Sequence, residues 1–197
     1  MSQQKRLSIV LALNIAMIAG LISVGLASHS LGVLAAGGDF IADSLAIGLG
    51  LVAVNLRDKY GNKKAPTYVA LVNGILLLGI TVFVLFQAIE RLLTKSPEVL
   101  GLPVLIISII STIVMIISAL ILGCGAGKED LHMRSVLLDT LSDGLSAAAV
   151  AVVGAIIFFS SGYYWLDAAV AALVSVVIAY NAVRLLRDVH SALKTTV

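Results

Sequence analysis

Charged residues are scarce in this chain: Asp, Glu, Lys and Arg together make up 12% of its 197 residues. An ordinary soluble domain carries about 25% charged residues, and a disordered chain usually combines high net charge with low hydrophobicity. The scarcity of charge therefore excludes a soluble enzyme and a disordered tail. Cysteine is scarcer still. Cys124 is the single one, so no disulfide bond can form within the chain.

Apolar residues are abundant instead: they make up 60% of the chain, and the mean hydropathy is +1.09. A helix needs about 20 residues to cross the hydrocarbon core of a bilayer. Six apolar runs meet that length, at residues 7–28, 31–56, 67–89, 100–123, 131–159 and 165–186. We therefore predict an all-α, multi-pass protein of the cell membrane, with six transmembrane helices in the lipid bilayer. Residues 1–197 form a single transmembrane domain in this interpretation, without a soluble C-terminal domain.

The Lys and Arg residues predict the orientation of these helices. If the N-terminus is cytoplasmic, eleven of the thirteen basic residues lie on the cytoplasmic side, and Arg91 and Lys95 lie outside. Such a bias is typical of membrane proteins, whose cytoplasmic loops are rich in Lys and Arg. We therefore expect both termini in the cytoplasm. The same rule accounts for the basic residues, so a nucleic-acid partner is not needed to explain them.

Four aspartates interrupt the apolar runs in a repeated pattern. Asp39 and Asp43 lie four residues apart in the second run, and Asp139 and Asp143 repeat that spacing in the fifth. Residues four apart share one face of a helix. Each pair begins eight residues into its run, which places it about 12–18 Å deep at 1.5 Å per residue. If the two helices are neighbours, four carboxylates converge near the midplane of the membrane.

Such a cluster has a specific chemistry. Carboxylates that repel one another in a medium of low dielectric retain protons when the site is empty. A divalent cation solves the same electrostatic problem, but the carboxylates must lose their protons to bind it. Metal and protons then compete for one site. A protein that exposes this site alternately to the two sides of the membrane is a metal/proton antiporter.

Several segments match one family of membrane proteins in order and spacing. They are Ser30-Leu31-Gly32-Val33-Leu34-Ala35 followed by Asp39-x-x-x-Asp43, Tyr60-Gly61 with Ala70-Leu71-Val72-Asn73, Asp139-x-x-Ser142-Asp143-Gly144, and Trp165-Leu166-Asp167. In these segments the sequence resembles the cation diffusion facilitators, which are six-span exporters, usually homodimers, that exchange divalent metal for protons. The resemblance implies that Asp39, Asp43, Asp139 and Asp143 are the metal ligands. It also implies that the metal is a substrate, with no cofactor.

The chain departs from the family in its metal ligands and in its length, among other features. The family commonly has His at the first position of the fifth-span pair, and often of the second-span pair, whereas this chain has Asp139 and Asp39. Imidazole suits zinc, while carboxylate suits harder ions such as manganese. The family's frequent substrates, zinc, cadmium and cobalt, favour the opposite choice, so Zn²⁺ and Mn²⁺ both stay open. Most members also end in a cytoplasmic, dimerising domain. We expect this chain to be a short form without it, either naturally or because the sequence is truncated.

Four further residues are candidates for secondary roles. His29, at the outer mouth, could pass protons or metal, or simply be a solvated loop residue. Ser111, on a face of small and polar residues in the fourth run, could line a wet path or a packing surface. Ser142 lies beside Asp143 and is a third pathway candidate. Asp167, at the start of the sixth run, is interpreted as a surface acid at a helix N-terminus.

Three alternative functions remain from the residues alone. One is proton conduction without metal, and another is a non-transporting subunit that needs a partner. The third is an enzyme, a membrane lipid phosphotransferase that uses an Asp-bound metal. The families of that kind need an Arg shortly after Asp143-Gly144, and this chain has only Leu145, Ser146, Ala147 and Ala148 there. We therefore expect a transporter and no enzyme.

Overall fold

The computed structural model describes residues 3–60, 65–123 and 131–195. Those residues form six α-helices and no strand. The helices are α1 (Gln3–Ala27), α2 (Leu31–Tyr60), α3 (Ala65–Leu93), α4 (Gly101–Gly123), α5 (Leu131–Ser160) and α6 (Trp165–Thr195). Each contains an apolar stretch of 19 to 27 residues, which is long enough to cross a bilayer. The predicted all-α fold with six membrane-spanning helices is therefore confirmed.

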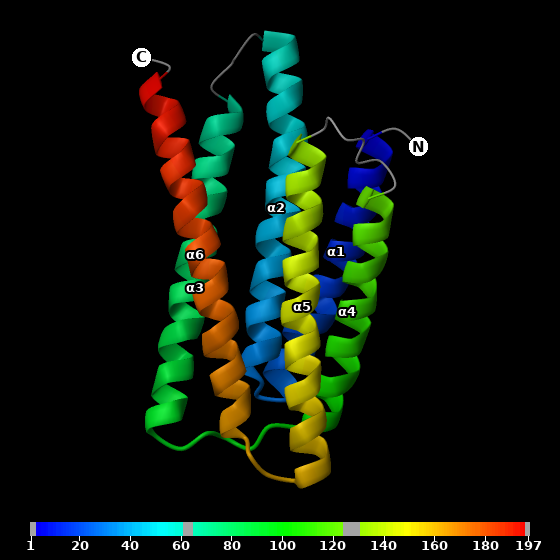
Figure 1. The fold of residues 1–197 in the computed structure, drawn as a ribbon, viewed down its shortest axis with the longest axis vertical. Helices are drawn as coiled ribbons and strands as arrows, with labels where there is room; N and C mark the ends of the chain where they lie inside the picture. Colours follow the sequence, from blue (N-terminus) through cyan, green and yellow to red (C-terminus); the bar gives the residue numbers. More distant parts are fainter. Residues whose placement is uncertain (1–2, 61–64, 124–130, 196–197) are drawn as a thin grey trace.

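The helices form one elongated bundle (Figure 1). α3 and α6 lie at one side, α1 and α4 at the other, and α2 and α5 between them. α3 packs mainly on α6, and α4 packs mainly on α5. The start of α1 and the end of α6 lie at the same end of the bundle. Which of its ends faces the cytoplasm stays a prediction.

Three short connections lie at the opposite end, which we call the turn end: residues 28–30, 94–100 and 161–164. The first is a three-residue turn between α1 and α2. The N–H groups of His29 and Ser30 donate to the carbonyls of Leu26 (3.3 Å) and Gly25 (3.0 Å), and His29 has a left-handed φ of 56°. This is the Schellman ending of a helix. It satisfies carbonyls at the end of α1 that would otherwise have no partner within the helix.

Two glycines bring α4 and α5 into close contact. A methyl group on Gly154 of α5 would lie 2.9 Å from the backbone nitrogen of Leu105. A methyl group on Gly101 of α4 would lie 2.5 Å from the backbone nitrogen of Phe158. Small residues are the usual means of close approach between membrane helices, where van der Waals packing rather than the hydrophobic effect drives association. The backbones of α4 and α5 thus pack directly on each other.

We predict that Gly154→Ala lowers the stability of the protein, because the new methyl group would force the α4 and α5 backbones apart. The expected cost is about 1–3 kcal/mol, as for other overpacked interiors. Gly79→Ala on α3 is the matched control, since nothing lies within 4 Å of a methyl group there. Thermal unfolding in detergent, followed by circular dichroism, compares the two variants. Equal Tm values would show that the α4–α5 contact is not tight.

Candidate metal site

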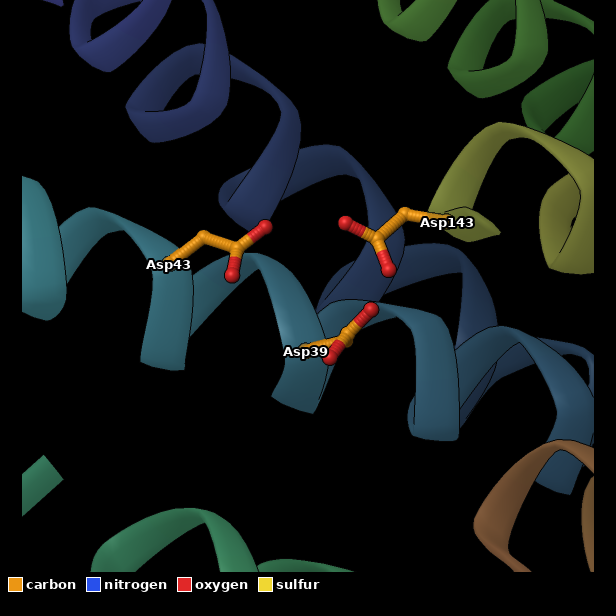
Figure 2. Close-up of side chains that lie close together, drawn as sticks. All are labelled: Asp39, Asp43 and Asp143. Atoms are coloured by element: carbon orange, nitrogen blue, oxygen red, sulfur yellow. The ribbon is translucent and has the colours of Figure 1, made fainter. Parts of the chain in front are cut away.

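Three of the predicted aspartates lie together between α2 and α5 (Figure 2). One carboxylate oxygen each from Asp39, Asp43 and Asp143 can be chosen so that all three atoms lie within 4.8 Å of one another. All three residues are half-buried. The sequence predicted this convergence on the condition that the second and fifth spans are neighbours. α2 and α5 do pack against each other, so the condition is met.

The fourth aspartate lies only partly within the described structure. Asp139 is on α5, four residues before Asp143, and its side chain is outside the described part of the chain. One turn of helix therefore separates it from a member of the cluster. Its role as a ligand stays a prediction.

The spacing of the three carboxylates suits one ion. Oxygen ligands lie about 2.0–2.6 Å from Zn²⁺ or Ca²⁺, so two ligands of the same ion are at most roughly 4–5 Å apart. The 4.8 Å limit for this cluster is within that range. Three carboxylates around one point can therefore bind a divalent cation, with oxygen as the only donor atom.

A hollow between α2, α3 and α6 has Asp39 in its wall. Its walls are mostly apolar, and its polar residues besides Asp39 are Thr81 and Ser175. The Thr81 hydroxyl donates to the Leu77 carbonyl at 2.7 Å. The Ser175 hydroxyl is buried and has no hydrogen-bond partner among the described residues. Sequence reasoning missed both, because single Ser and Thr residues are common in membrane helices and neither follows a pattern.

The three pathway candidates lie at different places. His29 is exposed in the α1–α2 turn, and its carbonyl accepts a 2.5 Å hydrogen bond from Arg91 Nη1. Ser111 is fully buried on α4, and its hydroxyl has no partner in the described part of the chain. Ser142 is exposed. None of these positions tests a role in transport, so all three roles stay predictions.

Asp167 corrects one interpretation from the sequence. It does lie in the first turn of α6, but the prediction of a surface position was wrong, because the residue is 1% exposed. Its carboxylate accepts hydrogen bonds from Ser30 Oγ (2.5 Å), Leu31 N (2.7 Å) and Gly32 N (3.3 Å). Asp167 thus caps the start of α2, a different helix. A buried helix end needs such acceptors, since no water is there to supply them.

Comparison with known proteins adds an independent observation. Residues 7–193 match the cation efflux transmembrane domain family. The chain is 32% identical over 194 residues to the zinc transporter ZitB of Yersinia pseudotuberculosis, which covers 95% of this chain and 62% of that protein. It is 28% identical over 200 residues to a cadmium, cobalt and zinc/H(+)-K(+) antiporter of Bacillus velezensis, covering 95% of this chain and 63% of that protein.

A third relative is the metal cation efflux system protein CzcD of Cupriavidus metallidurans, 25% identical over 178 residues. The chain thus spans less than two thirds of the length of the relatives it matches. The family consists of transporters and not of enzymes. With six membrane-spanning helices and a family match over nearly its whole length, the chain is a multi-pass cell-membrane protein and belongs to the cation efflux, or cation diffusion facilitator, family.

Proposed function

We propose that the chain exports divalent metal cations from the cytoplasm in exchange for protons, and that Asp39, Asp43, Asp139 and Asp143 bind the metal. The observation that carries the proposal is the convergence of three carboxylates from two helices inside the membrane-spanning bundle. Ionisable residues are costly at such positions and usually mark a transport pathway. The names of the relatives, which are metal transporters, support the same function.

Asp139 is the fourth ligand in this proposal. α5 runs antiparallel to α2. The step of one turn from Asp143 to Asp139 therefore has the same direction along the bundle as the step from Asp39 to Asp43. Asp139 then comes level with Asp43, just as Asp143 comes level with Asp39. Four oxygen ligands would complete the tetrahedral arrangement that is usual for zinc.

Competition between metal and protons supplies the coupling. The carboxylates must be deprotonated to bind the cation. After the cation leaves, protons must neutralise them again before the empty site can reorient, because unpaired charges are costly inside the membrane. Each transport cycle therefore carries metal one way and protons the other. The hollow lined by Asp39 also borders α3 and α6. We infer that a rearrangement there changes the side from which the site is reached.

The proposed ligands are all oxygen atoms, and this donor type influences which metal cations the site can prefer. Zinc, cadmium and cobalt are the divalent metals in the names of two of the relatives, and we propose Zn²⁺ as the first substrate to test. Carboxylates bind harder ions such as Mn²⁺ as well, so Mn²⁺ is the second. The metal is cargo in both cases, and assembly as a homodimer stays a prediction.

Transport by the purified protein in proteoliposomes with a pH gradient tests the proposed function. Metal uptake should be accompanied by opposite proton movement, read with an internal metal dye and an internal pH dye. Asp43→Ala and Asp143→Ala should each abolish the metal flux, because each removes one of the converging ligands. Asp139→Ala should do the same if Asp139 is the fourth ligand.

Asp188→Asn is the matched control, since Asp188 is an exposed acid of α6 and should transport like wild type. Metal flux in Asp143→Ala equal to that of wild type would refute the proposed site. Proton movement that needs no metal would instead favour the alternative of a proton conductor.

We also predict that Asp143→Asn separates metal binding from stability. Removing one of three neighbouring carboxylates relieves repulsion, so the metal-free variant should unfold at the same Tm as wild type or higher. Zn²⁺ should raise the Tm of wild type, because it binds only the folded protein, and should raise that of the variant much less. Thermal unfolding with and without Zn²⁺ measures both effects. A marked loss of stability in the metal-free variant would indicate a structural aspartate instead.

A further inference from the structure

The start of α2 is the place where three helices meet. Ser30 precedes α2, and its hydroxyl oxygen accepts a hydrogen bond from Val33 N at 3.1 Å. Asp167 of α6 accepts the N–H groups of Leu31 and Gly32 at 2.7 and 3.3 Å. The first three N–H groups of α2 therefore all have acceptors, and two of the three depend on a side chain from another helix. α6 thus holds the end of α2 in place along its axis.

Gly32 connects the same point to α5. A methyl group on Gly32 would lie 3.2 Å from Asp167 Oδ1 and 3.2 Å from Cγ1 of Val150. The glycine is buried, with the Asp167 carboxylate on one side and an α5 side chain on the other. We call Gly32, Val150 and Asp167 the three-helix junction.

Along α2 and along α5, the junction is the same number of residues away from a carboxylate of the metal site. Asp39 comes seven residues after Gly32 on α2, and Asp143 comes seven residues before Val150 on the antiparallel α5. Seven residues of helix span about 10 Å. Contact between Gly32 and Val150 therefore sets the register that brings Asp39 level with Asp143.

Small shifts of this register would affect the metal site. A displacement of α2 by one residue moves Asp39 and Asp43 by about 1.5 Å along the axis, whereas binding groups need to be held within about 0.5 Å of their working positions. Arg91 of α3 strengthens the same region, because its guanidinium attracts the Asp167 carboxylate and donates to the carbonyl of His29. The polar contacts of Asp167 are thus built to resist such a shift.

We propose that Asp167 is a positioning residue of the metal site, which it does not touch: by capping α2, it fixes the register of Asp39 and Asp43 against Asp143. This role rests on the proposed function of the three carboxylates as metal ligands. It differs from a general contribution to stability, because loosening the cap should weaken metal binding even in a protein that is still folded.

Titration of the purified full chain in detergent with Zn²⁺, by calorimetry, tests the proposal. Asp167→Asn keeps the size of the side chain but replaces one acceptor oxygen with an NH₂ group, so at least one of its three hydrogen-bond donors loses its acceptor. We expect its Kd for Zn²⁺ to rise about tenfold or more, the range seen when groups that orient metal ligands are lost. Ser30→Ala removes one donor to Asp167 and the cap of Val33 N, and should weaken binding in the same direction.

Two control variants separate positioning from stability. Asp188→Asn makes the same chemical change at an exposed site of α6 and should bind Zn²⁺ like wild type. Val189→Ala removes buried apolar volume from α6 far from the junction, so it should lower the Tm and leave the Kd unchanged.

An Asp167→Asn protein with a lowered Tm but the Kd of wild type would overturn the positioning role alone. A wild-type protein that binds no Zn²⁺ would contradict the proposed function itself, and the positioning role with it. If Asp167→Asn does not fold, Ser30→Ala decides by the same comparison, because that variant leaves both backbone hydrogen bonds of the Asp167 carboxylate in place.

Discussion

A polar group inside hydrocarbon must find its partner within the protein, and the structure depends on that constraint throughout. Backbone groups meet it by forming long helices. The buried start of α2 meets it through side chains, because Ser30 and Asp167 accept its first N–H groups. The converging aspartates follow the same constraint in another way, because the partner that neutralises them in the proposed function is the transported ion or the exchanged protons.

Much of this arrangement could be predicted from the sequence, because its signals are local. The lengths of the apolar runs predicted six helices, and each helix begins within four residues of its predicted run. The ends agree less well, since α6 continues to Thr195, nine residues past its predicted run. Pro66 and Pro103 do not interrupt these helices, since they lie in the first turns of α3 and α4, where a missing N–H is tolerated. The four-residue spacing of Asp39 and Asp43 placed both on one face of α2, and the second pair in the fifth run predicted the position of Asp143 beside them.

Contacts between distant segments could not be predicted in this way. Asp167 was correctly placed in the first turn of α6, but its partners Ser30, Leu31 and Gly32 come about 135 residues earlier in the chain. Nothing in the local pattern distinguishes an acid that faces water from one that caps a neighbouring helix. Ser175 and Thr81 were missed beside Asp39 for a related reason, since only the packing of α3 and α6 against α2 brings them there.

The missing side chain of Gly32 has a consequence for the choice of ion. Gly32 of α2 lies so close to α5 that a methyl group on it would be 3.2 Å from Cγ1 of Val150. The carboxylates of Asp39 and Asp143 lie near each other between the same two helices, two helical turns away. Selectivity among hard cations depends on the size of the cavity and its rigidity as well as on the type of ligand. In the proposed function, a residue that contributes no ligand atom therefore helps to set the ionic radius that the aspartates enclose, because it determines how closely the two helices approach.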